Sequence, residues 1–262
     1  MEKYDLVVVG GGTSGCIAGK TAAELGFKVC ILEQKIKKEI GIKACGEAVG
    51  IHHFYNVGVS PPKGDEVHSK VAGIDVLSPD LKTIHRIKVK NLTGFMINRK
   101  VFGLRLLRKA LDAGAKFLDQ TLVLEPIFKN NFTVGVKVKD LARNKTTEIY
   151  GKVVLDASGI KAILRRKIPL NWQIERIIEN SDLESCIQET REVATQIEDP
   201  AYLKIIFSRK IAPGGYYWIF PKGNNLINVG LGVQMTKNYP NPKKQLYEHV
   251  LSQALFKKLK EN

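Results

Sequence analysis

The spacing of apolar residues predicts a strand, a helix and a second strand at the start of the chain. Residues 6–9 are a continuous apolar run, which is typical of a strand buried on both faces. After a glycine-rich loop, residues 16–25 carry small side chains that favour a helix, and Gly26 ends it. Residues 27–32 form the second strand. Together these segments predict a β–α–β unit.

The middle of the chain mixes loop, helix and strand signals. Residues 36–62 contain scattered glycines and predict a loop. An amphipathic helix is expected over residues 99–114, where Val101, Leu104 and Leu107 share one face. Strands are expected at 71–89 (broken by a turn at 78–80), 117–124, 133–139, 146–150 and 153–155.

The pattern changes after Pro169. Residues 174–195 predict a helix that passes into a strand. Glycine and asparagine turns then separate three antiparallel strands, and an amphipathic helix closes the chain. These elements are expected at 202–207, 216–220, 226–233 and 243–260.

The loop after the first strand has the spacing of a dinucleotide-binding motif. Gly10, Gly12 and Gly15 match G-x-G-x-x-G, in which glycine permits a tight turn, close approach of a pyrophosphate and close helix packing. Glu33 ends the second strand, where a carboxylate accepts hydrogen bonds from ribose hydroxyls. Because the motif lies between a strand and a helix, it predicts FAD or NAD at the amino end of that helix. The later helix at 99–114 and the Asp156-Ala-Ser-Gly159 turn favour FAD.

These features predict an α/β protein with two domains. We expect a Rossmann-like FAD-binding domain of the glutathione-reductase type with an inserted antiparallel-sheet substrate domain. The expected boundaries are 1–62 and 93–168 for the first domain, 63–92 and 169–240 for the second, and 241–262 for the terminal helix.

Several stretches resemble the geranylgeranyl reductase family, flavoproteins with the para-hydroxybenzoate-hydroxylase type of fold. The most specific runs from Pro213 to Pro221 and, with Gly230 and Gly232, is similar to the family's Y-x-W-x-F-P…G-x-G signature. The others are the dinucleotide loop with Glu33, the Asn98-Arg99 helix start, the Cys-Gly segment at 43–48, and residues 71–79, which are similar to archaeal lipid reductases. The resemblance covers essentially the whole chain.

The resemblance implies a reaction and candidate catalytic residues. It implies an FAD-dependent reductase that saturates C=C bonds of geranylgeranyl chains in archaeal-type membrane ether lipids or their prenyl diphosphate precursors. Cys45, Gly46 and Glu47 are the candidate catalytic residues, with the Cys45 thiol shaping or protonating at the flavin face. A cysteine is otherwise a small buried hydrophobe, and Glu47 is either a proton relay or a solvated loop carboxylate.

The family also implies binding residues. Tyr216, Trp218 and Phe220 alternate, so they share one strand face and either line an apolar tunnel for a prenyl chain or form ordinary sheet core. With them, the expected substrate site comprises Pro221, Gly230 and Gly232. The expected FAD-binding residues are Gly10, Gly12, Thr13, Ser14, Gly15, Cys16, Glu33, Gln34, Ala44, Cys45, Gly46, Arg99, Val123, Asp156, Ala157 and Gly159.

One departure from the family pattern opens alternatives. Family members continue into a Gly-Asp stretch that contacts the flavin ring, and no such stretch follows Gly232. We therefore expect the C-terminal flavin-contacting part to be missing, which makes a non-catalytic fragment one alternative to the reductase. An FAD-dependent monooxygenase or halogenase of the same fold is the other, although the Cys-Gly segment and the aromatic strand disfavour it.

Charge and sequence motifs limit the classes of binding partner to be expected. The chain of 262 residues has a formal charge of +15, and basic proteins bind anions, although solubility alone also explains such a charge. Basic clusters at 35–43, 165–167 and 257–260, with an apolar face on the terminal helix, favour contact with an anionic membrane surface or packing on the missing part. The sequence contains no RNA-binding or helix-turn-helix pattern, so nucleic acid is not an expected partner. A single dinucleotide loop predicts that ferredoxin or transiently bound NAD(P)H donates electrons.

Cysteine and histidine usage predicts neither disulfides nor a metal. The four cysteines form no CxxC pair, and His52 and His53 have no third ligand, so we expect the histidines to be loop residues. No secretory signal or membrane-spanning run is evident. The expectation is a reduced, cytoplasmic protein with peripheral contact on the inner face of the cell membrane.

Overall fold

The computed structural model describes residues 3–88, 93–193 and 197–252, and the chain divides into two compact units. Unit 1 comprises residues 1–42 and 100–177, and unit 2 comprises residues 43–99 and 178–262. These bounds differ from the predicted domains, because the first segment of unit 1 ends at Ile42 instead of residue 62. The Cys45 region therefore belongs to unit 2.

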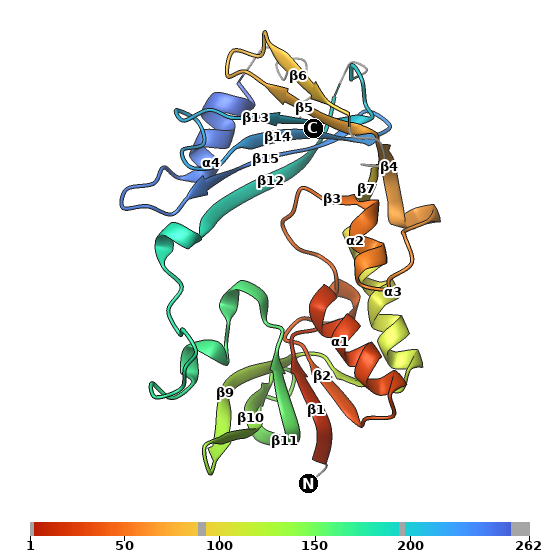
Figure 1. The fold of residues 1–262 in the computed structure, drawn as a ribbon, viewed down its shortest axis with the longest axis vertical. Coiled ribbons are helices and arrows are strands. Elements are labelled where there is room, and N and C mark those ends of the chain that lie inside the picture. The colour runs from red at the N-terminus through yellow and green to blue at the C-terminus, as the bar shows by residue number, and fades with distance from the viewer. Residues whose placement is uncertain (1–2, 89–92, 194–196, 253–262) are drawn as a thin grey trace. The chain divides into compact units, whose positions relative to one another are not determined.

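Unit 1 is built on a six-stranded sheet with strand order β8-β2-β1-β11-β10-β9 (Figure 1). β1 pairs in parallel with β2 and β11, β2 pairs in parallel with β8, and β9 and β10 are antiparallel. The strands are β1 (Lys3–Val9), β2 (Val29–Leu32), β8 (Lys116–Leu118), β9 (Thr121–Lys129), β10 (Phe132–Asp140) and β11 (Lys145–Asp156). The helices are α1 (Thr13–Glu24) and α3 (Arg99–Asp112), with short 3₁₀ turns at Lys37–Glu39, Gly159–Lys161 and Arg165–Lys167.

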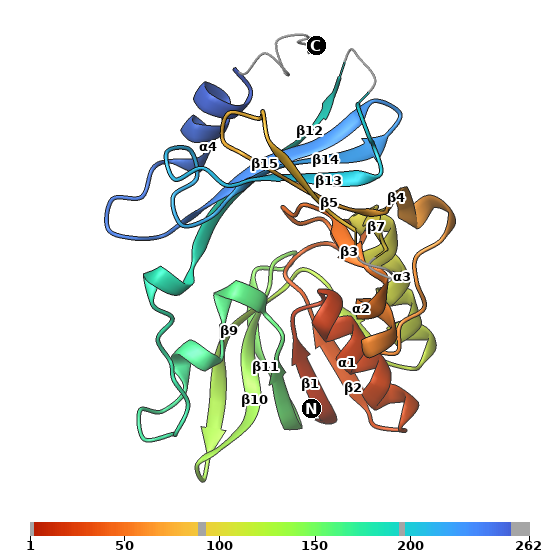
Figure 2. The ribbon, with the colours of Figure 1, turned by 45° about the horizontal axis from the view of Figure 1, so that its top comes forward.

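Both faces of the parallel part of this sheet are covered. Val8 and Ile31 pack with Ala23 of α1 and Ala110 of α3, so the two helices lie on one face (Figure 2). On the other face Val7 packs in a cluster with apolar residues of β9 and β10. This double burial is the physical reason for the continuous apolar runs of β1 and β2. The predicted β–α–β unit is confirmed.

β11 differs from the sequence expectation. Residues 146–150 and 153–155 were expected as two strands, but they lie in one continuous strand. It pairs antiparallel with β10 through Tyr150 and parallel with β1 from Tyr150 to Asp156. The strand thus changes partners at Tyr150 without a break.

Unit 2 contains a six-stranded sheet of order β12-β15-β14-β13-β5-β6 and a small sheet of order β3-β7-β4. The strands are β3 (Ala48–Gly50), β4 (Val67–Val71), β5 (Gly73–Leu77), β6 (Ile84–Ile87), β7 (Gly94–Ile97), β12 (Glu184–Glu192), β13 (Tyr202–Ile206), β14 (Tyr217–Gly223) and β15 (Leu226–Gln234). Helix α2 (Ile51–Asn56), helix α4 (Pro242–Gln245), a π-helical turn at Leu246–Val250 and 3₁₀ turns at Gly64–Glu66 and Asn180–Asp182 complete the unit. The large sheet is antiparallel except for the parallel pair β5–β13.

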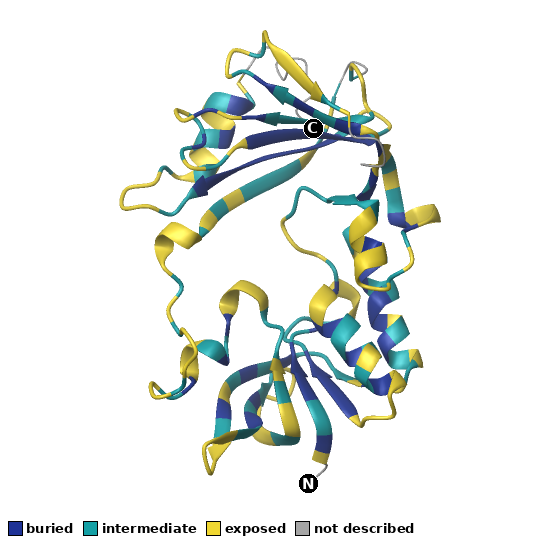
Figure 3. Ribbon diagram, viewed as in Figure 1, coloured by how far each residue is buried: buried dark blue, intermediate teal, exposed yellow. Residues whose placement is uncertain are grey.

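β14 and β15 form the buried centre of unit 2 (Figure 3). On one face, Tyr217 and Ile219 pack with Leu246 and Val250 of the terminal segment. On the other face, Trp218 and Phe220 pack in a separate cluster that includes Val71 of β4 and Met96 of β7. The alternation of β14 thus divides two cores.

Two sequence expectations are wrong and a third is tested only in part. Residues 36–62 are not only loop, because they contain β3 and α2, and His52 and His53 lie on α2 with ring centroids 4.0 Å apart. No α-helix forms between Ile174 and β12, where a 3₁₀ turn precedes the strand. Ile174 and Ile177 are exposed, so no apolar face is buried there. The terminal helix begins at Pro242, and its expected part beyond residue 252 lies outside the described residues.

Candidate functional site

The glycine loop of unit 1 is closely packed on one side and open on the other. A Cβ on Gly15 would lie 1.8 Å from the carbonyl oxygen of Gly10, and one on Gly10 would lie 2.5 Å from that of Ala157. Gly10 also has a φ of +108°, which favours glycine. At Gly12 a Cβ would meet nothing within 4 Å. The loop therefore leaves its open backbone at the amino end of α1.

This end of α1 fits a bound pyrophosphate. The first turn of α1 has no capping side chain and no acidic residue. Its backbone N–H groups and the positive end of the helix dipole consequently attract an anion. Thr13 and Ser14 are exposed on this turn, whereas Gly15 is buried. The open position at Gly12 leaves room for close approach of phosphates.

Glu33 supports the loop in addition to marking the end of β2. Its Oε2 accepts a hydrogen bond from the Gly11 N–H at 2.8 Å, and its Oε1 accepts one from the Lys35 N–H at 2.9 Å. A carboxylate has about four acceptor positions, so ribose hydroxyls are compatible with these contacts. The support of Gly11 was not predicted; the ribose contact stays a prediction.

The Asp156 turn is shaped by its own side chain. The Oδ1 atom accepts hydrogen bonds from the Ser158 N–H and hydroxyl, and Oδ2 accepts them from the N–H groups of Leu164 and Arg165. The turn also brings Ala157 against Gly10, while Gly159 adopts a φ of +66°. Asp156 therefore has a structural role next to the glycine loop.

Three other predicted cofactor residues of unit 1 have contacts within the protein. The Cys16 thiol donates to the Gly11 carbonyl at 3.2 Å, and burial raises the pKa of Cys16 to about 12, with a smaller contribution from Glu33. This thiol stays protonated and serves packing. Val123 is buried in the sheet core, and the Gln34 Oε1 accepts a hydrogen bond from Lys161 Nζ at 3.2 Å.

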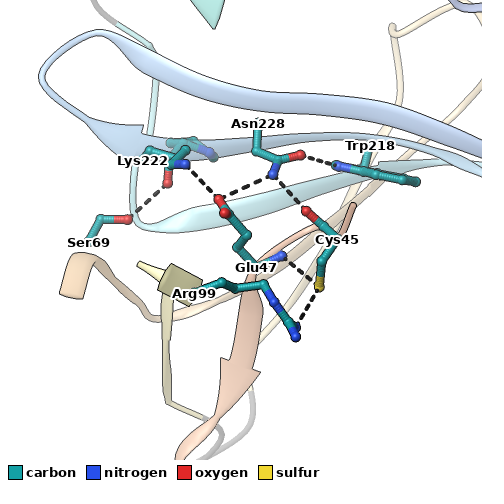
Figure 4. Close-up of polar contacts among 8 residues, drawn as sticks. Cys45, Glu47, Ser69, Arg99, Trp218, Lys222 and Asn228 are labelled. Atoms are coloured by element: carbon teal, nitrogen blue, oxygen red, sulfur yellow. Dashed lines mark hydrogen bonds and ion pairs between the residues drawn. The ribbon is translucent and has the colours of Figure 1, made fainter. Parts of the chain in front are cut away.

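The Cys45 segment belongs to unit 2, where two donors face the sulfur atom (Figure 4). The Arg99 guanidinium and the Glu47 backbone N–H each donate to Cys45 Sγ at 3.3 Å. Cys45 is half-buried, and Ala44 before it is exposed. Arg99, predicted to contact FAD, thus contacts the candidate catalytic thiol.

Glu47 is not a solvated loop carboxylate. Its Oε2 lies 2.6 Å from Lys222 Nζ, with 15% of the Glu47 side chain and 8% of the Lys222 side chain exposed. Asn228 Nδ2 donates to the same carboxylate at 3.3 Å and to the Cys45 carbonyl at 2.9 Å. Glu47 has a φ of +65°, so the segment turns sharply between the thiol and this ion pair.

The predicted aromatic face of β14 is confirmed. Ring centroids of Tyr216 and Trp218 are 6.0 Å apart, as are those of Trp218 and Phe220, and Phe207 extends the row at 5.9 Å from Tyr216. These four residues are called the aromatic row below. A Cβ on Gly46 would lie 2.8 Å from the Phe220 ring, so the Cys45 segment packs against one end of the row.

The glycines of β15 are explained by packing within the sheet. A Cβ on Gly230 would lie 2.5 Å from the Trp218 ring, and one on Gly232 would lie 2.9 Å from Cys186 Sγ. The Trp218 side chain therefore requires Gly230. Pro221 is buried, and its carbonyl accepts a hydrogen bond from the Ser69 hydroxyl at 2.9 Å.

A pocket of about 520 Å³ opens at the Tyr216 end of the aromatic row. It is lined by Phe207 and Tyr216 together with Ser208, Arg209, Glu184 and Gln234, among others. Burial raises the pKa of the Tyr216 hydroxyl, and the carboxylate of Glu184 contributes further. The hydroxyl therefore remains a hydrogen-bond donor where an apolar row meets a polar pocket.

Two central residues of this cluster were not identified from the sequence. Lys222 follows Pro221 and Asn228 lies two residues before Gly230, so both fall in the spacer between the two parts of the recognised signature. Alternation placed Asn228 on the same strand face as Gly230. Lys222 pairs with Glu47, and Asn228 donates to Cys45, which is 183 residues away in the chain, so no local pattern reveals either pairing.

No metal site or membrane span is found in the described part of the chain. Its His, Cys, Asp and Glu side chains form no group of three or more that could hold a metal ion. Likewise, none of the helices formed by residues 3–88, 93–193 and 197–252 is both long and apolar enough to cross a bilayer.

Comparison with known proteins agrees with this geometry. Residues 5–167 match the model of the FAD dependent oxidoreductase family, and residues 182–262 match that of the geranylgeranyl reductase catalytic domain. The chain therefore belongs to the FAD-dependent oxidoreductases. Its resemblance to the geranylgeranyl reductases is confirmed, and the predicted FAD cofactor agrees with the family model that matches residues 5–167.

Individual relatives show which part of the family the chain resembles. It is 35% identical to the digeranylgeranylglycerophospholipid reductase of Sulfolobus acidocaldarius and 31% identical to that of Methanosphaerula palustris, over 91% of this chain in both cases. These alignments cover 52% and 57% of the relatives, so the chain spans about half of their length.

Solved structures extend the comparison. A geranylgeranyl bacteriochlorophyll reductase-like protein from Thermoplasma acidophilum superposes with a TM-score of 0.85 at 28% identity, over 100% of this chain and 65% of that one. The myxobacterial chondrochloren halogenase has a TM-score of 0.71 at 17% identity, over 89% and 53%. The second likeness shows the fold alone.

Proposed function

We propose that this chain forms the dinucleotide-binding and sheet parts of an FAD-dependent reductase that saturates geranylgeranyl chains. Its substrates are archaeal-type membrane ether lipids or their prenyl diphosphate precursors. The observation that carries the proposal is the aromatic row packed against the Cys45 segment, in a chain whose relatives are named digeranylgeranylglycerophospholipid reductases.

The cofactor is assigned to the amino end of α1. Gly12 leaves the backbone open, the first turn of α1 offers N–H groups to the phosphates, and Glu33 lies at the end of β2 for the ribose. Bound FAD, once reduced by the electron donor, would supply the hydride for the reduction. In this proposal Cys45, Gly46 and Arg99 lie on the flavin side.

The substrate is assigned to the aromatic row. Trp218 and Phe220 are each 7% exposed, whereas Tyr216 is 37% exposed and borders the pocket. Because Trp218 and Phe220 pack against Val71 and Met96 in the core, an apolar chain would reach the row at its Tyr216 end. There the Tyr216 hydroxyl and Arg209 border the pocket and would meet the polar end of the substrate. The proton is assigned to the Cys45 thiol, with Glu47 and Lys222 as the adjacent ionisable pair.

The first experiment measures FAD uptake and then reduction. The purified chain is titrated with FAD and its visible spectrum is recorded. We expect the protein to bind FAD and to show the yellow flavin absorption. It is then incubated without oxygen with reduced FAD and a geranylgeranyl glycerophospholipid, and mass spectrometry should show a gain of hydrogen pairs. Cys45→Ala should lower turnover with unchanged flavin content.

Two results would contradict the proposal in different ways. A colourless chain that takes up no FAD would support the non-catalytic fragment. A hydroxylated or halogenated product formed in air, without saturation of the lipid, would support the monooxygenase or halogenase alternative.

The electron donor and the membrane contact are further parts of the proposal. One dinucleotide loop favours ferredoxin or transient NAD(P)H as the electron donor. Comparing the oxidation of NADPH with that of reduced ferredoxin by the FAD-loaded chain distinguishes them.

The charge of +15 favours docking on anionic lipid. Co-sedimentation with phosphatidylglycerol vesicles, lost in high salt and absent with phosphatidylcholine, would support it.

A further inference from the structure

One fully buried amide connects the aromatic row to the Cys45 segment. The Asn228 Oδ1 accepts a hydrogen bond from the Trp218 indole N–H at 2.9 Å. On its other side, Nδ2 donates to the Cys45 carbonyl at 2.9 Å and to the Glu47 carboxylate at 3.3 Å (Figure 4). The side chain is 0% exposed, so water does not replace these partners.

The partners at this position need both an acceptor and a donor, and the Asn228 amide supplies both. An indole N–H only donates and a peptide carbonyl only accepts, so the residue between Trp218 and Cys45 must present an acceptor to one and a donor to the other. Aspartate offers no donor when ionised, and leucine offers neither group. The same partners determine which way the Asn228 amide faces.

The amide therefore relates two features that are far apart in sequence. Trp218 also lies over Gly230 and packs, with tilted rings, between Tyr216 and Phe220, so its ring orientation sets the middle of the aromatic row. The Cys45 carbonyl belongs to the segment whose thiol faces Arg99. A shift of either group changes a hydrogen bond of the other.

We propose that Asn228 is a positioning residue that couples the orientation of the Trp218 ring to the placement of the Cys45 thiol. The inference deepens the proposed function, because it gives a route by which a chain on the aromatic row affects the candidate catalytic group. Its geometry does not depend on flavin, and the experiment below uses none.

The test uses a background in which each side of the amide has its own reporter. The chain contains two tryptophans, so Trp172→Phe leaves Trp218 as the only fluorophore of its kind. Cys16 and Cys30 are buried, so Cys186→Ser leaves Cys45 as the accessible thiol. Trp218 emission and the rate of Cys45 alkylation by iodoacetamide are measured in this W172F/C186S chain.

Two substitutions separate the two sides. While its carboxylate is ionised, Asn228→Asp keeps an acceptor for Trp218 but offers no donor to Cys45 and adds a negative charge beside Glu47. We expect the emission maximum to stay and alkylation of Cys45 to become about fivefold faster, the effect of one lost hydrogen bond on an equilibrium. Asn228→Leu should change both, with an altered emission maximum and faster alkylation.

A neighbouring polar residue is the control. Thr190 faces Asn228 across the β12–β15 pair and is exposed. Thr190→Val should change neither reporter. Alkylation within twofold of the background in both Asn228 variants, or an emission shift in N228D equal to that in N228L, would overturn the coupling.

A third measurement applies if the Asn228 variants do not fold, as judged by circular dichroism. Carboxamidomethylation of Cys45 in the W172F/C186S chain with Asn228 intact should shift Trp218 emission, because the added group moves the Cys45 carbonyl. Unchanged emission after complete modification would contradict the inference. A failure of the proposed reductase function would instead appear as absent FAD uptake, with both reporters still coupled.

Discussion

Gly12 and Gly15 lie three residues apart in one loop, yet their surroundings make opposite demands on a side chain. A Cβ on Gly15 meets the Gly10 carbonyl at 1.8 Å, whereas one on Gly12 meets open space. Gly15 therefore serves the packing of α1 on β1. Gly12 leaves room for a ligand, and the motif spacing alone does not separate these roles.

Alanine substitutions distinguish them. Gly15→Ala should lower the free energy of unfolding by at least about 2 kcal/mol, because backbone must move, and should lose FAD binding with it. Gly12→Ala should stay within about 0.5 kcal/mol of the parent but bind FAD more weakly. Urea denaturation and FAD titration measure both. Equal stability losses in the two variants would contradict this assignment.

The thiols of this chain differ in their reactivity with pH. Burial raises the pKa of Cys16 to about 12, so the reactive thiolate remains a minor species below that pH while the protein is folded. We expect iodoacetamide to leave Cys16 unmodified between pH 7 and about 9.5, and to modify it in urea. Mass spectrometry of peptides measures this, with exposed Cys186 as the internal control. Modification of Cys16 as fast as Cys186 would contradict its burial.

At the scale of elements, Lys222 of β14 forms an ion pair with Glu47 that holds the Cys45 segment on the large sheet. Both side chains are largely buried, so removing one partner leaves a charge without compensation. Lys222→Met should therefore destabilise the protein by about 3 kcal/mol in urea denaturation. The double variant Lys222→Met/Glu47→Gln should regain part of that loss.

The control for this prediction is an exposed pair. Lys244 and Glu248 lie 3.9 Å apart on the terminal segment, with most of both side chains in water. Lys244→Met should have no measurable effect, since exposed pairs contribute little. Equal effects of the two lysine variants would show that the pair at Glu47 is solvated.

The terminal segment completes the core of unit 2. Its apolar face was expected to meet a membrane or a missing part of the protein, but Leu246 and Val250 are fully buried against the large sheet. Leu246→Ala should cost about 3 kcal/mol by creating a cavity, while exposed Lys243→Ala should not. A small effect of L246A in urea denaturation would mean that this segment is dispensable for the sheet.

For the whole molecule, the division into two units predicts two unfolding transitions, each of which one tryptophan reports. Trp172 lies in unit 1 and Trp218 in unit 2, so Trp218→Phe and Trp172→Phe chains each report one unit. FAD at about 100 times its dissociation constant should stabilise unit 1 by about 2.7 kcal/mol. Thermal unfolding followed by fluorescence should show the larger shift at Trp172. Equal shifts at both tryptophans would indicate a single cooperative unit.

The sequence by itself determined the elements whose signal is local. The glycine loop with its flanking strand and helix, the α3 helix and the alternating aromatic residues of β14 were all correctly predicted, because each follows from neighbouring residues and a fixed period. The errors arose where tertiary packing decides the secondary structure: at α2, in the continuous β11, and after Ile174. In the last case the apolar side chains of the predicted helix are exposed, so no packing stabilises a helix there.

Only the tertiary structure decided how the candidate site is assembled. Cys45, Arg99, Lys222 and Asn228 come from distant parts of the chain, and their hydrogen bonds depend on strand pairing and on the turn at Glu47. A pattern along the chain reports burial and periodicity, whereas a buried hydrogen bond reports which two groups meet. For that reason the sequence identified the thiol and the aromatic row, and the fold identified the amide between them.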